Sequence, residues 1–289
     1  MRVSGYNTFY HNNNIKPTFT EYRDFVMNNN GRLDYRMDTC SFRHDIDFDR
    51  FAKFLGDKFP NLSDVEFVVH ACSDGEEAYT YASAFDCVLG DRAKPLYPLT
   101  AKDLNPKCVE LANNAVYKMR SYELDHAKFQ LSGKVDDYYK LLEKGNCYEL
   151  RTPSDKIKHL VKFAQGNIFN DIDNLKGHKT VLSARNFWQY LKSEDAILLA
   201  YKIAKKFDST CMLVIGHCDK DAGIDEILTE LHFREVPELN NVFVKTRDSL
   251  PSPGKLHLTY SARKLLQDFE YLHMSKFSKF MYNLAKFVI

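Results

Sequence analysis

The stretch Glu66–Glu77 reads EFVVHACSDGEE and decides the fold. Its Phe-Val-Val core predicts a buried strand, and the Ser-Asp-Gly that follows predicts a tight turn into a helix. A second predicted strand, Tyr97–Ala101, leads to Asp103. In a parallel sheet, a glycine-containing turn lets a ligand approach the backbone, and an acid ending the next strand accepts hydrogen bonds from ribose hydroxyls. We therefore expect a ligand that contains adenosine.

The turn alone is weak support for a nucleotide site, because it lacks the three-glycine fingerprint. A purely structural turn is the alternative. Ser73 and Asp74 can cap the helix that begins near Glu76, and Glu76 and Glu77 place negative charge in its first turn. That charge repels a pyrophosphate, which would normally bind there. A cationic or zwitterionic tail fits better, and S-adenosylmethionine, with its sulfonium and amino groups, is such a ligand.

The composition is that of a soluble enzyme of modest size. The 289 residues are 44% apolar, and 40 basic against 39 acidic residues leave a formal net charge of +1. This balance argues against nucleic acid as a partner. The seven cysteines form no close CxxC pair, which favours reduced thiols and a cytoplasmic location. Neither a signal peptide nor a membrane-spanning run is found, and we expect no metal site.

Three regions follow one another along the chain. Residues 1–40 are polar and rich in asparagine, and we expect an N-terminal arm there. Residues 41–248 alternate strand and helix patterns, which predicts a parallel sheet covered by helices. The sheet is expected to close with a hairpin of Leu231–Glu235 and Asn241–Thr246. Residues 249–289 form a basic amphipathic tail, which either packs on the domain or docks on a partner, nucleic acid or an anionic membrane surface.

The segment 121–162 interrupts the alternation of strands and helices and predicts a small inserted subdomain. It contains a charged helix candidate, Val135–Lys144, and an alternating strand pattern, Cys147–Arg151. A further strand pattern, Ile157–Ala164, returns the chain to the main sheet. An insert of this kind is a candidate surface for docking a partner.

Five sequence blocks resemble, in this order, the motifs of the CheR-type chemotaxis receptor methyltransferases. They are Thr39–Arg43 (TCSFR), Ala71–Tyr79 (ACSDGEEAY), Thr100–Asn105 (TAKDLN), Val181–Leu191 (VLSARNFWQYL) and Ile215–His217 (IGH). Members of this family use S-adenosyl-L-methionine to esterify glutamate side chains. The resemblance, from Thr39 to Thr246, implies an α/β, Rossmann-like methyltransferase fold with a mostly parallel sheet, a closing antiparallel hairpin and an inserted subdomain.

The resemblance also implies a role for each matching residue. Arg43 would hold the acceptor carboxylate beside the transferred methyl, and Tyr190 would face the acceptor. Asp103 would bind the ribose, and Asn167 would lie on the adenine side. The remaining cofactor contacts would be Ser73, Asp74, Gly75, Glu76 and Glu77 at the methionine part, with Arg185 and Asn186 at the mouth of the site. The product would be S-adenosyl-L-homocysteine, and the insert matches a subdomain that docks a receptor peptide in some members.

Simpler interpretations stand beside these roles. Arg43 could instead form an ion pair with Asp45. Asp103 could instead cap the following helix, and Tyr190 could instead pack in the core. The sequence also departs from the family, because Asp74 stands where threonine is usual and Ala78 where proline is usual. The helical N-terminal domain of the family is mostly replaced by the short arm, which weakens the case for chemoreceptors as substrates.

The leading interpretation is a methyltransferase that uses S-adenosylmethionine to esterify a protein carboxylate. A carboxylate with a pKa of ~4.3 is already ionised at neutral pH, so positioning and desolvation suffice and no general base is required. One alternative is the same fold acting on a non-carboxylate acceptor. The other is a binding or regulatory protein that keeps the cofactor fold without turnover.

Overall fold

The computed structural model describes residues 40–256, 266–267 and 269–271. The predicted N-terminal arm before residue 40 and most of the predicted tail lie outside these residues. Within the described ranges, no helix combines the length and the hydropathy that crossing a membrane requires.

Seven strands form the central sheet. They are β1 (Glu66–His70), β2 (Leu99–Asp103), β6 (Val161–Gln165), β7 (Thr180–Ala184), β8 (Met212–Val214), β9 (Phe233–Glu235) and β10 (Val242–Lys245). Their order in the sheet is β6-β2-β1-β7-β8-β10-β9. β1 pairs in parallel with β2 and with β7, and its Phe67 and Val69 enter one hydrophobic core while Val68 enters the other. A strand that buries both faces explains the continuous apolar run in its sequence.

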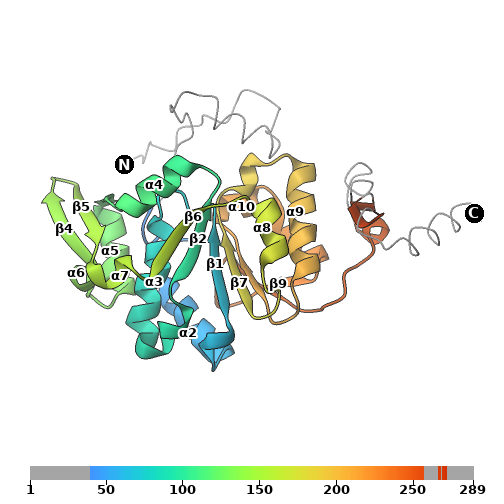
Figure 1. Cartoon of the computed structure of the whole chain (residues 1–289), viewed down its shortest axis with the longest axis horizontal. Coiled ribbons are helices and arrows are strands. Elements are labelled where there is room, and N and C mark those ends of the chain that lie inside the picture. The colour runs from blue at the N-terminus through green and yellow to red at the C-terminus, as the bar shows by residue number, and fades with distance from the viewer. Residues whose placement is uncertain (1–39, 257–265, 268, 272–289) are drawn as a thin grey trace, which may run out of the picture.

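Helices cover both faces of the sheet, as Figure 1 shows with the sheet between two layers. One layer contains α2 (Phe48–Lys58), α3 (Glu76–Leu89) and α4 (Pro106–Asn114), and the other contains α8 (Ile168–Asp171), α9 (Ser193–Lys206), α10 (His217–Asp221) and α11 (Ile224–Glu230). Short 3-10 helices lie at Leu62–Asp64 (η1), Gly90–Leu96 (η2), Ile172–Asn174 (η3), Trp188–Tyr190 (η4) and Pro253–Lys255 (η5). The predicted alternation of strands and helices is thus confirmed.

The inserted segment forms a second, antiparallel sheet in the order β3-β5-β4. Its elements are β3 (Tyr117–Arg120), α5 (Ser121–Gln130), α6 (Val135–Tyr138), β4 (Tyr139–Lys144), β5 (Tyr148–Pro153) and α7 (Asp155–Lys158). The predicted helix Val135–Lys144 is wrong beyond Tyr138, because pairing with β5 overrides the helical preference of the charged residues. The predicted strand Ile157–Ala164 is also wrong at its start, where α7 and a turn precede β6.

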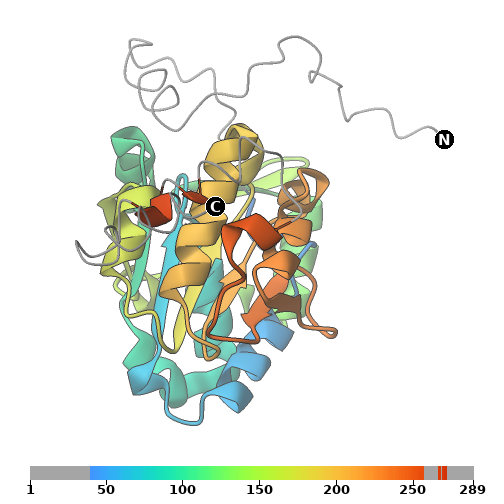
Figure 2. The same ribbon diagram turned by 90° about the vertical axis from the view of Figure 1, so that its right-hand side faces the viewer.

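The closing hairpin is confirmed, since β10 pairs antiparallel with both β9 and β8. The described part of the tail packs on the helices at this side of the sheet. Leu256 and Leu266 are buried in the core that contains α9 and α11, and Phe269 meets Tyr201 of α9 edge to face. In Figure 2, α9 lies in front of the sheet, so this part of the tail covers the outer surface of the helical layer.

Candidate functional site

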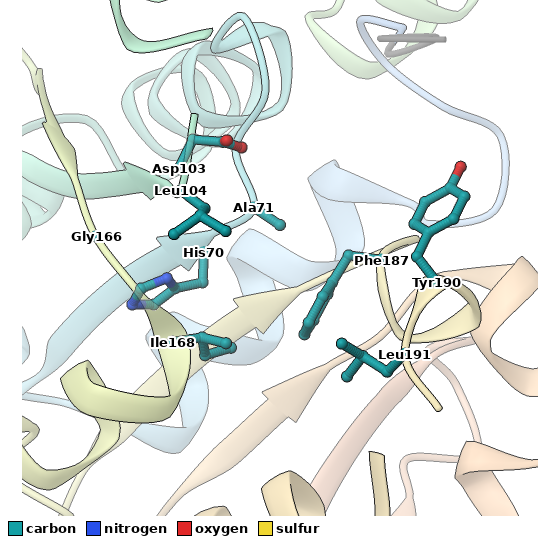
Figure 3. A pocket seen from close by; sticks show the side chains of 9 residues that line it. All are labelled: His70, Ala71, Asp103, Leu104, Gly166, Ile168, Phe187, Tyr190 and Leu191. Atoms are coloured by element: carbon teal, nitrogen blue, oxygen red, sulfur yellow. The ribbon is translucent and has the colours of Figure 1, made fainter. Parts of the chain in front are cut away.

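A pocket opens where the parallel strands end. It is lined by residues that follow β1, β2, β6 and β7, namely His70, Ala71, Asp103, Leu104, Gly166, Ile168, Phe187, Tyr190 and Leu191 (Figure 3). Its empty volume, including the part open to solvent, is about 460 Å³. In doubly wound sheets, ligands bind outside the carboxyl ends of the strands.

The turn after β1 has an unusual backbone. Ala71, Ser73 and Gly75 all have positive φ angles, of 56°, 51° and 90°. A side chain at Gly75 would be strained by this φ, and its Cβ would lie 2.7 Å from the Phe163 ring. The Tyr117 hydroxyl of β3 donates to the Asp74 carbonyl over 3.0 Å, so the insert also holds this turn. Gly75 is therefore required by the turn and by close packing, independently of any ligand.

Asp103 ends β2 at the wall of the pocket. Its Oδ2 accepts the Ser73 N–H over 2.8 Å and its Oδ1 accepts the Asn105 N–H over 2.9 Å. Asn105, whose side chain accepts the Lys107 N–H, is the N-cap of α4, so capping by Asp103 is wrong. Burial raises the pKa of the Asp103 carboxyl, although these N–H donors lower it. The Leu104 N–H is a third donor, and since a carboxylate has about four acceptor sites, one remains for a hydroxyl of a ligand.

Two acids flank the start of α3: Asp74, which is half-buried in the loop before it, and Glu76, which is buried in its first turn. Asp74 Oδ1 accepts the Glu76 N–H at 3.4 Å, while Gly75 occupies the N-cap position. Burial raises the pKa of Asp74 to about 6, and burial together with Asp74 and Glu123 raises that of Glu76 well above its usual range. Among the residues that the structure describes, no group donates a hydrogen bond to the buried Oε2 of Glu76. A ligand ammonium would satisfy this oxygen.

Arg185, at the end of β7, is the centre of a buried ion-pair network. Its Nη1 lies 3.0 Å from Glu77 Oε2, and its Nη2 lies 2.6 Å from Asp45 Oδ1. Glu77 also accepts the Ser183 hydroxyl over 2.6 Å, and Ser183 in turn pairs with the Tyr81 hydroxyl at 3.1 Å. Burial alone would lower the pKa of Arg185, but the two carboxylates raise it. The family residues Glu77 and Arg185 thus bind each other, and their contact with a cofactor stays a prediction.

Asn186 and Asn167 are both held by hydrogen bonds, one through its backbone and the other through its side chain. The Asn186 N–H donates to Asp219 Oδ2 over 2.6 Å. Asn167 caps α8 by accepting the Phe169 N–H over 3.0 Å. Neither lines the pocket, but Gly166 and Ile168, on either side of Asn167, do. Their predicted contacts with a cofactor are not tested by this arrangement.

The two residues predicted to act on the acceptor lie on different elements. Tyr190, in η4, lines the pocket on the side opposite Asp103 (Figure 3). Arg43 is half-buried, and its charge lowers the pKa values of Asp45, Asp74 and Glu76. Arg43 is therefore close to the acids of the loop, and Asp45, the alternative partner of Arg43, forms an ion pair with Arg185.

Sequence reasoning placed two residues, Asp103 and Tyr190, in the lining of this pocket and missed the others. Most of the other lining residues are apolar or lie at a strand end, such as Leu104 after Asp103. Their position at the end of a predicted strand is the only sequence feature that indicates them. The sequence pattern assigns no role to His70, the last residue of β1. Burial lowers the pKa of His70 to about 4, so it is neutral at pH 7, and its Nε2 lies 3.4 Å from Asp171 Oδ2.

The residues present fit S-adenosylmethionine. Asp103 offers carboxylate oxygens for ribose hydroxyls, the apolar walls of the pocket suit a purine, and Glu76 offers a buried oxygen for the amino group. The parallel sheet with a terminal antiparallel hairpin and this set of strand-end residues define the class of S-adenosylmethionine-dependent methyltransferases.

Comparison with known proteins gives the family. The CheR methyltransferase, SAM binding domain family matches residues 37–234, which is more than half of the chain. The chain belongs to this family, and S-adenosyl-L-methionine is its methyl donor. Among solved structures, the chain is similar to a TehB-like SAM-dependent methyltransferase from Corynebacterium glutamicum. The identity is 10%, with 68% of this chain and 99% of that chain covered and a TM-score of 0.32.

Proposed function

We propose that this methyltransferase esterifies a carboxylate of a protein. Asp103 holds the ribose of the methyl donor, Glu76 holds its amino group, and Arg43 holds the acceptor carboxylate. The observation that carries the proposal is the position of Arg43, whose charge acts on both Asp74 and Glu76 of the loop assigned to the methionine part. A guanidinium suits this role because its planar fork binds a carboxylate through two hydrogen bonds.

Two anchors fix the backbone on either side of Arg43. The Phe42 N–H donates to Thr80 Oγ1 of α3 over 3.3 Å. Asp45 pairs with Arg185, and its Oδ2 accepts the His217 N–H over 3.2 Å. Burial opposes ionisation of Asp45, but Arg185 outweighs it and lowers the pKa of this carboxyl. The segment between these anchors can therefore present Arg43 in a defined place.

The methyl transfer requires the protein mainly to position the donor and the acceptor. An acceptor oxygen bonds to the methyl carbon, the sulfur–carbon bond breaks, and its electron pair stays on sulfur, which yields S-adenosyl-L-homocysteine. An ionised carboxylate has no proton to lose, so no general base is required. The protein has to align the two reactants and exclude water, which is the work of oriented and partly desolvated groups.

The test is an Arg43→Ala variant assayed with donor labelled in its methyl group. Because Arg43 is assigned to the acceptor, donor affinity should change less than about threefold, well below the tenfold that ~1.4 kcal/mol represents. Transfer of label to protein in a cell extract should be lost. Label transferred by the unmodified enzyme should be released by mild base, as carboxyl esters are. Unchanged transfer by the variant contradicts the assignment, and tight donor binding without any labelling favours the regulatory alternative.

An amine acceptor is the second candidate, and one observation favours it. Asp74 and Glu76 are near enough to Arg43 for its charge to lower both of their pKa values, and Asp74 stands where the family usually has threonine. Acids at this place attract a cation more readily than a carboxylate. Label that resists mild base would identify this acceptor, since methylated amines do not hydrolyse.

We further propose that the acceptor protein docks on β4. This strand is at the edge of the small sheet, and every residue after Tyr139 is exposed, including Leu141 and Leu142. An extended peptide can add to such an edge as a further strand. Leu142→Asp should leave stability within about 0.5 kcal/mol and donor affinity unchanged while reducing protein labelling.

The matched control for this docking experiment is Phe129→Asp on α5, because Phe129 is 78% exposed and lies outside β4. It should label protein at the unmodified rate. Equal loss of labelling in both variants, or no loss in either, would contradict docking on β4.

A further inference from the structure

Asp219, in α10, is fully buried and accepts three backbone hydrogen bonds. Its Oδ2 accepts the N–H groups of Gly216 over 2.8 Å and of Asn186 over 2.6 Å, and its Oδ1 accepts that of Trp188 over 3.1 Å. The first bond lies within the start of α10. The other two reach across to the segment that follows β7, so one carboxylate joins two loops at the carboxyl ends of neighbouring strands.

The segment held by Asp219 forms one wall of the pocket. Phe187 lies between the two tethered residues, and Tyr190 and Leu191 follow directly after them. The backbone of Asn186 has a φ of 58°, a conformation that a non-glycine residue adopts only when its surroundings hold it. The Trp188 indole donates to the Ala184 carbonyl over 2.7 Å, and its ring packs against Phe187 at 5.1 Å. The wall is thus fixed from behind by Asp219 and Trp188.

We propose that Asp219 is a positioning residue for the cofactor pocket, which sets the place of Phe187 and Tyr190 through the backbone without touching either reactant. The proposal rests on the pocket being the S-adenosylmethionine site.

The role requires an ionised carboxylate. Both oxygens then act only as acceptors, which matches three N–H donors. An asparagine, or a protonated acid, would turn a donor towards one of these N–H groups. Burial raises the pKa of Asp219 to about 7 against the effect of the three donors, and Arg185 is the cation that favours its charge. Cys218, whose pKa is raised by burial and by Asp219, is a further titratable group near it, and Asp221 and Asp45 act on the same thiol. Asp219→Asn therefore imitates the protonated state.

The experiment measures S-adenosylmethionine affinity by calorimetry at pH 8. Asp219→Asn should weaken binding about tenfold, equal to ~1.4 kcal/mol. The control is Asp208→Asn, since Asp208 also accepts a backbone N–H, from Thr210 over 2.9 Å, but lies before β8 and away from the pocket. The control should bind within twofold of the unmodified protein. Unmodified affinity in Asp219→Asn overturns the proposal, whereas an unmodified protein that fails to bind overturns the assignment of the pocket itself.

A second measurement needs no variant, in case Asp219→Asn does not fold. Trp188 is the only tryptophan in the chain, so its emission reports on the tethered wall. Between pH 8 and pH 6, donor affinity should fall by up to about tenfold, and the Trp188 emission should change with the same midpoint. Constant affinity in the folded protein across this range would overturn the role of Asp219.

Discussion

The two halves of the site use their carboxylates differently. On the β1–β2 half, Asp103 lines the pocket and Glu76 has a buried oxygen without a hydrogen-bond donor among the described residues. On the β7–β8 half, Glu77 and Asp45 are paired with Arg185, and Asp219 is occupied by three backbone N–H groups. Acids of the first kind are available for a ligand, although Asp103 also accepts the Ser73 and Asn105 N–H groups. Those of the second kind hold the backbone that the ligand meets.

Two acids that are adjacent in the sequence belong to different groups. Glu76 and Glu77 are adjacent in the first turn of α3, yet the former turns to the loop and the latter into the ion-pair network. The direction follows from helix geometry, because successive side chains on a helix point about 100° apart. A motif that contains both acids therefore combines a binding role and a positioning role, and mutations should separate the two.

The largest effect is expected for Arg185→Ala. This change leaves Glu77 and Asp45 buried without their cation, which typically costs 3–5 kcal/mol, so we expect about that loss in the free energy of unfolding. Urea denaturation measures it. Lys107→Ala, which breaks an exposed 2.8 Å pair with Glu110, is the control and should change stability by less than about 0.5 kcal/mol. A loss of less than about 0.5 kcal/mol in Arg185→Ala would contradict the structural role of the acids that pair with Arg185.

The second effect is expected in binding. Asp103→Ala should weaken S-adenosylmethionine affinity by about 1–3 kcal/mol, because hydrogen bonds to a charged acceptor are lost. Titration calorimetry measures this change. Asp47→Ala is the matched control, since Asp47 also accepts a backbone N–H, from Arg50, but caps α2 outside the pocket. Equal affinity in the unmodified protein and Asp103→Ala would show that Asp103 only holds the backbone and does not bind the donor.

The sequence predicted the first half of the site better than the second. The strand, the turn and the acid ending the next strand are local patterns, and Asp103 was found from them. The tethers of Arg185 and Asp219 join residues more than 30 positions apart, and no local pattern encodes such a contact. Asp219 did leave one signal, an acid three residues after Gly216, which favours the start of a helix. The helix predicted at Val135–Lys144 failed for a similar reason, because pairing with β5 decided the structure of its second half.

The pH dependence of stability gives the finest test of the comparison. Burial raises the pKa of Asp74 from 3.8 to about 6, so the folded protein binds this proton more tightly than the unfolded chain does. The contribution of Asp74 to stability should therefore rise as the pH falls from 7 towards 5, the reverse of the usual behaviour of a paired carboxylate and opposite to that of His70, whose lowered pKa destabilises the fold over this range. Relative to Asp74→Asn, the unmodified protein should gain about 1–2 kcal/mol over this range in urea denaturation. Saturating S-adenosylmethionine should flatten the difference, because a cationic ligand beside the loop favours ionised acids. A pH dependence that survives saturation would show that the loop acids do not face the donor, and Glu76 would then belong with Glu77 among the positioning residues.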